Sequence, residues 1–105
     1  MNQVVFIDDE KHIRQANKQT LELADLAVTC HDCAEEALPV LSTEWPGVVI
    51  CDIRLPNMDG LEFLVRAQKI DPNLPVILIT GHGDISTAVQ AMRDGAYDFI
   101  EKPYS

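Results

Sequence analysis

A chain of 105 residues is the size of one compact domain and is too short for two independent cores. Its 47% hydrophobic and 24% charged content is typical of a globular domain. No apolar run reaches the roughly 18 residues that cross a bilayer, and the N-terminus lacks a signal peptide. We therefore expect a cytoplasmic protein without membrane contact. The formal net charge of −9 repels a phosphate backbone, and we expect no direct binding of nucleic acid.

Short apolar runs rich in Val and Ile predict β-strands, and amphipathic stripes between them predict helices. In chain order, the predictions are a strand at 3–8, a helix at 13–24, a strand at 26–30, a helix at 34–41, a strand at 47–53, a helix at 61–68, a strand at 75–80, a helix at 85–92 and a strand at 97–100. Three strands are apolar without alternation, as parallel strands covered on both faces are. The alternation of strands and helices predicts an α/β, doubly wound fold with a five-stranded parallel sheet.

Two helix starts are marked by acidic pairs three residues apart, Asp32 with Glu35 and Asp59 with Glu62. Pro39 lies inside the stripe at 34–41, where it lacks a backbone donor and clashes with the preceding turn. We therefore expect that helix to be short or kinked.

Polar groups gather at the carboxyl ends of the predicted strands, where open parallel sheets bind their ligands. Clustered carboxylates either raise a pKa or bind a cation, and an all-oxygen set favours Mg²⁺. Asp52 is the candidate nucleophile because an ionised carboxylate can attack phosphorus without a general base, while Thr80 and Lys102 would stabilise the phosphoryl oxygens. Any one of these residues alone would be read as a cap, a strand residue or a solvated charge. In chain order, the set is Asp8, Asp9, Glu10, Asp52, Thr80 and Lys102.

Four motifs that cover essentially the whole chain resemble those of the receiver domains of two-component response regulators. They are IDDE at 7–10, CDIRLPNMDG at 51–60, ILITGHGD at 77–84 and GAYDFIEKP at 95–103. The resemblance implies one receiver domain over residues 1–105, with a flavodoxin-like sheet in the order 2-1-3-4-5. The last two motifs are most similar to receivers attached to AAA+ activators of alternative-sigma-factor transcription, the nitrogen-regulator and dicarboxylate-transport-regulator class.

The resemblance implies a signalling switch that is phosphorylated once per cycle and is not a turnover enzyme. Asp52 would accept a phosphoryl group from a sensor histidine kinase. Asp8 and Asp9 would hold Mg²⁺ together with Asp52 and the backbone carbonyl of Arg54, with Asp9 the more direct ligand. The output module would be a transcriptional one, an AAA+ ATPase with a DNA-binding domain, for which this sequence has no segment.

Switching in this family uses the threonine and an aromatic residue three positions before the lysine, here Thr80 and Phe99. Because Phe99 has no hydroxyl, we expect it to act through burial of its ring. Residues 84–101, the predicted fourth helix and fifth strand, form the expected output face and a possible homodimer surface. The resemblance also implies a cis peptide bond between Lys102 and Pro103.

Two other functions compete with this interpretation. A small Mg²⁺-dependent aspartyl-phosphate phosphatase would also use an Asp nucleophile, but that family places it in a D-x-D on the first strand. A degenerate receiver acting as a constitutive interaction module would lack one of the site residues, whereas all of them are present.

The three cysteines and the side chains of two loop residues lie outside this set of site residues. Cys30 and Cys33 form a C-x-x-C, but the chain offers no second ligand pair, so coincidence is favoured over a zinc or redox site. Cys51 is expected to pack in the core. Arg54 and His82 are hypothesised to flank the phosphorylation site and to tune the access of water.

Receivers of this family place a fifth helix after the Lys-Pro turn, beside the first helix. The sequence stops before it, so the expected domain is truncated after the fifth strand. We therefore expect an exposed apolar strip on one face of the sheet, with reduced stability or association between molecules through that face.

Overall fold

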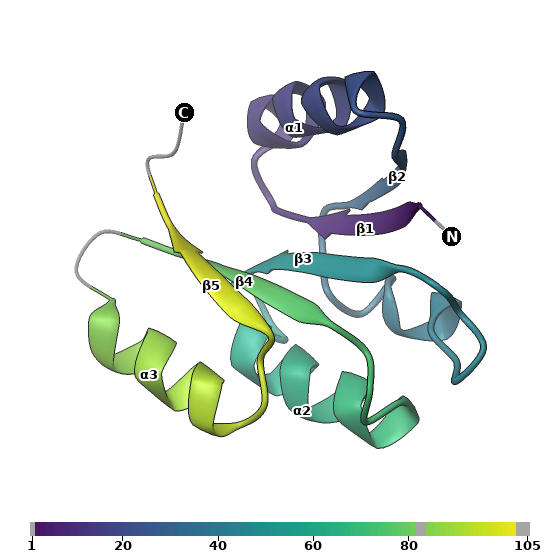
Figure 1. Cartoon of the computed structure of the whole chain (residues 1–105). Coiled ribbons are helices and arrows are strands. Elements are labelled where there is room, and N and C mark those ends of the chain that lie inside the picture. The colour runs from purple at the N-terminus through teal and green to yellow at the C-terminus, as the bar shows by residue number, and fades with distance from the viewer. Residues whose placement is uncertain (1, 82–83, 103–105) are drawn as a thin grey trace.

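A parallel sheet of five strands forms the centre of the fold in the computed structural model, which describes residues 2–81 and 84–102 (Figure 1). The strand order is β2-β1-β3-β4-β5, and every pairing is parallel. The predicted fold class and strand order are confirmed. The strands are β1 (Gln3–Ile7), β2 (Ala27–His31), β3 (Val48–Asp52), β4 (Val76–Thr80) and β5 (Asp98–Glu101).

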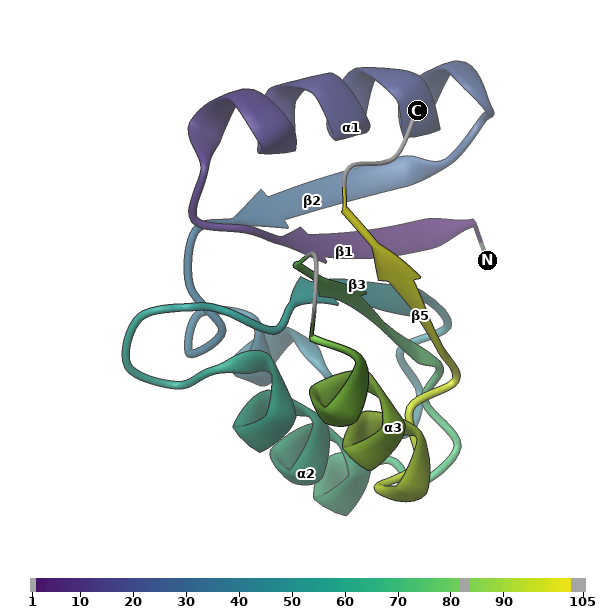
Figure 2. The same cartoon turned by 90° about the vertical axis from the view of Figure 1, so that its left-hand side faces the viewer.

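Helices cover both faces of the sheet. Helix α1 (Lys11–Leu23) lies on one face, while α2 (Gly60–Ile70) and α3 (Ile85–Arg93) lie side by side on the other (Figure 2). Asp59 caps α2 as predicted, because its carboxylate accepts the Glu62 N–H at 2.9 Å.

The α-helix predicted at 34–41 is wrong. Between β2 and β3 the described chain has only a 3₁₀ turn, η1 (Leu38–Val40), with Pro39 in its first positions. Proline fits the first turn of a helix but not its interior, so the apolar stripe packs onto the core without forming an α-helix. The predicted cap at Asp32 accordingly precedes no α-helix.

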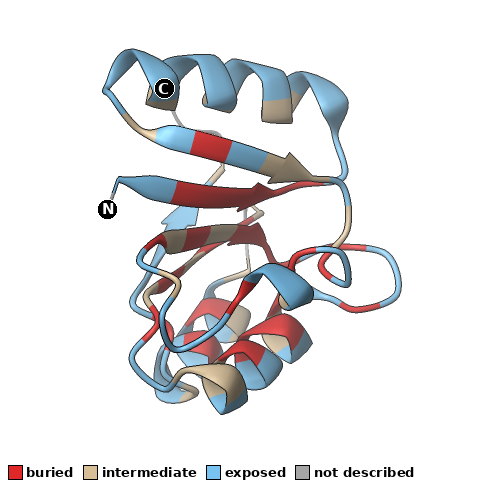
Figure 3. Ribbon diagram, turned by 90° about the vertical axis from the view of Figure 1, so that its right-hand side faces the viewer, coloured by how far each residue is buried: buried red, intermediate tan, exposed pale blue. Residues whose placement is uncertain are grey.

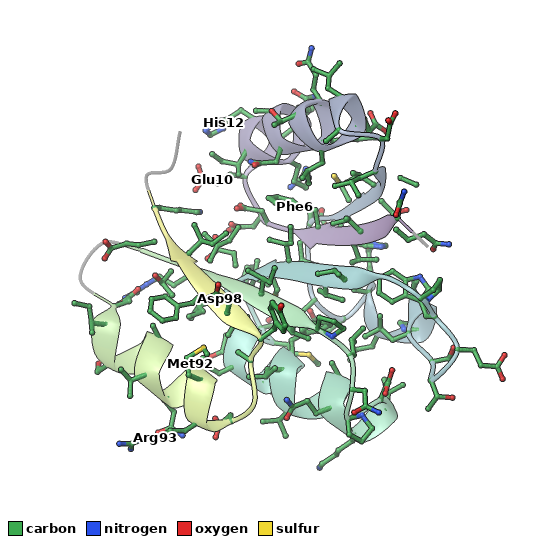
Figure 4. The ribbon with its side chains drawn as sticks, in the orientation of Figure 1. Phe6, Glu10, His12, Met92, Arg93 and Asp98 are labelled. Atoms are coloured by element: carbon green, nitrogen blue, oxygen red, sulfur yellow. The ribbon has the colours of Figure 1, made fainter. Side chains whose placement is uncertain are left out.

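The two faces of the sheet are covered unequally. On the α2 face, side chains from β1, β3 and β4 are buried with Phe63, Leu64 and Ala67. On the α1 face, Phe6 is buried between β1 and α1 (Figure 4), yet α1 itself has no buried residue and is exposed almost throughout (Figure 3). Most of the core therefore lies on the α2 face.

An apolar strip of the sheet is open on the α1 face, as expected. Helix α1 packs on β1 and β2. On the same face, Ile50 of β3 and Ile77 of β4 line a groove of about 460 Å³, and Ile100 of β5 is exposed. Association through this strip stays a prediction. In the part of the chain that the structure describes, no helix is long and apolar enough to pass through a membrane.

Candidate functional site

Asp8 is the most deeply buried acid at the carboxyl edge of the sheet. It follows β1 directly, and its side chain is fully buried. Its backbone N–H donates to the His31 carbonyl at 3.2 Å, which prolongs the β1–β2 pairing, and its Oδ1 accepts the Glu10 N–H at 2.9 Å. Burial raises the pKa of Asp8, against the effects of the Glu10 N–H and the nearby Lys102 charge.

Asp52 ends the neighbouring strand β3 and brings a second buried carboxylate to the same edge. Its Oδ1 accepts the backbone N–H of Arg54 at 3.0 Å, so the chain turns immediately after the strand. Its Oδ2 accepts a hydrogen bond from Lys102 Nζ at 2.9 Å. Both oxygens of the predicted nucleophile are thus held in place.

Lys102 joins the two acids across the sheet. Its backbone N–H donates to the Thr80 carbonyl at 2.7 Å, which extends the β4–β5 pairing and brings the lysine to the carboxyl edge. Its Nζ lies 2.9 Å from Asp52 Oδ2 and 3.3 Å from Asp8 Oδ2. Burial opposes the charge of this ammonium, but the hydrogen bonds and charges of the two acids outweigh it and raise the pKa of Lys102. We call Asp8, Asp52 and Lys102 the inner cluster.

The residues after β1 form an all-oxygen group beside the inner cluster. One carboxylate oxygen from each of Asp8, Asp9 and Glu10 lies within 4.8 Å of the others. Asp9 also lines a groove of about 600 Å³ at this edge. Lys102 already places a cation between Asp8 and Asp52, which shows that these carboxylates accept one there. The donor chemistry suits a hard cation such as Mg²⁺.

A second cation–carboxylate pair lies at the outer side of this groove. Arg54 Nε and Nη2 donate to Asp84 Oδ2 and Oδ1 at 2.9 and 2.7 Å, a two-point contact between the β3–α2 loop and the residue before α3. The contact raises the pKa of Arg54 and lowers that of Asp84. We call these two residues the outer pair.

The family of the chain follows from comparison with known proteins. A family model described as the response regulator receiver domain matches residues 4–105. The chain is a receiver domain of a response regulator. This membership favours the signalling switch over the phosphatase alternative.

Curated relatives of the receiver domain are transcriptional regulators. The C4-dicarboxylate transport transcriptional regulatory protein DctD of Pseudomonas aeruginosa is 56% identical over 102 residues, which is 97% of this chain and 22% of that protein. The DNA-binding transcriptional regulator NtrC of Klebsiella pneumoniae is 40% identical over 99 residues, 94% of this chain and 21% of that protein. The receiver domain therefore spans about a fifth of the length of these relatives.

Solved structures agree with the fold. A response regulator receiver domain protein from Clostridium thermocellum matches with a TM-score of 0.93 and 34% identity, covering 100% of this chain and 85% of that one. The receiver domain of NtrX from Brucella abortus matches with a TM-score of 0.89 and 40% identity, covering 97% and 87%. The expected family and architecture are confirmed.

The predicted switch residues lie on one side of the receiver sheet. Thr80 ends β4 and is buried, and Phe99 on β5 is paired with Leu78 and is exposed. Side chains two apart on a strand, and register partners on parallel strands, point to the same face. Thr80 and Phe99 therefore share the α3 face, where the ring of Phe99 is exposed. Their role in switching stays a prediction.

Cys51 packs in the core as expected, whereas coincidence at the C-x-x-C stays a prediction, since Cys33 lies near the carboxylates of Asp32 and Glu36. Cys51 is fully buried in the core on the α2 face, and burial raises the pKa of its thiol. Burial also raises the pKa of Cys30, which disfavours the thiolate that redox or zinc chemistry needs. His82 and Pro103, with the predicted cis bond, lie outside the described residues.

Sequence reasoning missed two side chains at this edge. Arg14 on α1 donates from Nη1 to the Asp8 carbonyl at 2.7 Å and so fixes the acidic turn. Asp84 pairs with Arg54, although it lies inside one of the family motifs. A strand-end argument finds neither, because both contacts start from residues outside the strands.

Proposed function

We propose that this receiver domain is the phosphorylation-controlled switch of a two-component system, in which Asp52 accepts a phosphoryl group from a sensor histidine kinase. One observation carries the proposal. The buried Asp52 carboxylate lies at the carboxyl edge of the sheet, 2.9 Å from Lys102 Nζ and 3.0 Å from the Arg54 N–H. A carboxylate needs no general base to act as a nucleophile, and this one has a cation beside it to receive the phosphoryl charge.

The chemistry is a displacement at phosphorus. A carboxylate oxygen of Asp52 forms the new P–O bond while the P–N bond of a phosphohistidine breaks, and the imidazole nitrogen leaves with the electron pair and takes a proton from solvent. Lys102 then donates to a phosphoryl oxygen, and the Thr80 hydroxyl donates to another as that segment moves inward. The event occurs once per signalling cycle, so the domain acts as a switch and not as a turnover enzyme.

Asp8, Asp9, Asp52 and the backbone carbonyl of Arg54 are proposed to hold Mg²⁺. When bound, the ion supplies positive charge to the phosphoryl oxygens. The clustering of oxygen ligands after β1 supports this assignment, and Glu10 adds a further carboxylate to the group. The Glu10 N–H and Arg14 hold this turn of the backbone in place.

The signal is proposed to leave through α3 and β5 toward a transcriptional output module of the AAA+ and DNA-binding kind. The names of the DctD and NtrC relatives support a transcriptional output. Large apolar side chains are exposed on this surface, which also suits a homodimer contact. They are Ile85, Val89, Met92, Tyr97 and Phe99.

The test is incubation with acetyl phosphate and Mg²⁺ followed by intact mass measurement. We expect the mass of one phosphoryl group on the wild type and none on Asp52→Asn. Asp59→Ser is the matched control, since it removes a carboxylate from the same groove but keeps a capping oxygen for α2. A folded wild type without the adduct, or an adduct on Asp52→Asn, would reject the proposal.

A further inference from the structure

The outer pair joins two segments that phosphoryl transfer itself does not require to be joined. Arg54 belongs to the loop after β3, and Asp84 directly precedes α3. Two parallel N–H···O contacts of 2.9 and 2.7 Å have the geometry of the strongest side-chain ion pairs. Asp84 is only 15% exposed, but the Arg54 side chain is 75% exposed, and ion pairs with an exposed member contribute little net stability. A competing anion can therefore displace Asp84.

Asp84 occupies the N-cap position of α3 without capping it. Its carbonyl accepts the Ala88 N–H at 3.0 Å, so the helix begins here, but its side chain makes no cap hydrogen bond. Asp59 shows the contrast within the same chain, since it caps α2 through the Glu62 N–H. The backbone also differs, with ψ of 38° at Asp84 and 177° at Asp59. Both Asp84 oxygens are instead engaged by Arg54.

Arg54 is tethered within reach of the phosphoacceptor. Its backbone N–H already donates to Asp52 Oδ1, and its side chain lines the same groove as Asp9 and Asp84. A phosphoryl group carries a charge of about −1.5 to −2 near neutral pH, more than the single charge of a carboxylate. A guanidinium group binds two oxygens of a phosphate through two N–H groups, just as it binds the two oxygens of a carboxylate. Phosphorylation of Asp52 thus creates a stronger competitor for Arg54.

We propose that the outer pair is a latch, which opens when Arg54 exchanges the Asp84 carboxylate for the phosphoryl group on Asp52. The released carboxylate then turns to the N–H groups of the first turn of α3 and caps the helix. This inference rests on the proposed function and extends it from Asp52 to α3. It gives the signal a route by charge exchange that does not involve Thr80 or Phe99.

Amide hydrogen exchange in α3 tests the latch, using the whole 105-residue chain with acetyl phosphate and Mg²⁺ and reading the adduct by intact mass in the same samples. In the wild type, phosphorylation should slow exchange of the Ser86 and Thr87 amides about fivefold, the effect of gaining one N-cap. Asp84→Asn, which breaks the charge pair but keeps a capping oxygen, should show this slow exchange without phosphorylation. Asp84→Ala should show fast exchange in both states.

Glu62→Gln is the matched control, because it breaks another exposed Arg–carboxylate pair, with Arg66 at 2.9 Å, that lies wholly within α2. It should leave α3 exchange as in the wild type. An adduct on the wild type with unchanged α3 exchange would overturn the latch and leave the proposed function standing. Absence of the adduct would overturn the proposed function and, with it, the trigger of the latch.

Discussion

The inner cluster and the outer pair are built from the same kinds of charge at the same edge of the sheet, yet their surroundings differ. In the inner cluster Asp8 is fully buried and Lys102 is only 23% exposed. In the outer pair Asp84 is 15% exposed, but the Arg54 side chain is 75% exposed. Removing one member of a buried pair leaves an uncompensated charge, whereas an exposed pair exchanges its partner for water or another ion.

This difference suits the two clusters to different tasks. The inner cluster keeps a nucleophile and a cation in fixed positions, which phosphoryl transfer requires. The outer pair changes partner at low cost, which a switch requires.

Lys102→Met should have the largest effect, because Asp8 and Asp52 would then face each other without a cation. We expect the free energy of unfolding to fall by about 2 kcal/mol, below the range for fully buried pairs because Lys102 is partly exposed. Urea unfolding without divalent ions measures it, and addition of Mg²⁺ should restore part of the loss. Lys69→Met, at an exposed position on α2, is the control. Equal effects of the two variants would contradict the inner cluster's structural role.

Arg14→Met should have the next largest effect, since it removes the 2.7 Å hydrogen bond that fixes the Asp8 carbonyl. We expect a loss of about 1 kcal/mol, the usual contribution of one such bond, together with weaker Mg²⁺ binding. Thermal unfolding and calorimetric Mg²⁺ titration measure the two effects. Lys18→Met changes an exposed cation on the same helix and should change neither. Unaltered Mg²⁺ affinity in Arg14→Met would show that the turn needs no support from α1.

Asp8→Asn should show a smaller effect whose size depends on pH. Burial raises the folded-state pKa of Asp8 above its ordinary value of 3.8. Folding therefore favours the protonated carboxyl, and the stability this gives is present below pH 3.8 and is lost as the pH rises through the raised pKa. In the presence of a chelator, the variant should match the wild type at low pH and exceed its stability at neutral pH.

Urea unfolding over a pH series measures this difference, with Asp9→Asn as the exposed neighbour for comparison. A variant that is less stable than the wild type at neutral pH would mean that the contact with Lys102 outweighs the burial of Asp8. The inner cluster would then be a net source of stability even without a metal.

The inner cluster could be predicted from the sequence, and the outer pair could not. Strand ends of a parallel sheet meet at one edge, so the apolar runs before Asp8 and Asp52 were enough to bring these acids together. Lys102 followed from its place after the last strand. The contact between Arg54 and Asp84 depends on the path of two loops and on side-chain rotamers, which periodicity does not encode.

The helix predicted at 34–41 failed for a related reason. Its apolar spacing is real, since Ala34, Ala37 and Leu41 are buried in the core. Spacing describes which residues face inward, but one proline decides whether the backbone between them can be helical. The spacing of apolar residues therefore predicts which side chains face the core more securely than it predicts the backbone conformation between them.

The smallest effect on stability should come from breaking the outer pair. Asp84→Asn and Arg54→Met, alone or together, should leave the urea midpoint nearly unchanged, because the Arg54 side chain is 75% exposed and water replaces its partner. The coupling between them in a double-mutant cycle should fall further as salt is added, since exposed charges are screened. A coupling as large as that of Lys102 with Asp52, and insensitive to salt, would contradict the latch, because a pair held so firmly would not yield Arg54 to a phosphoryl group.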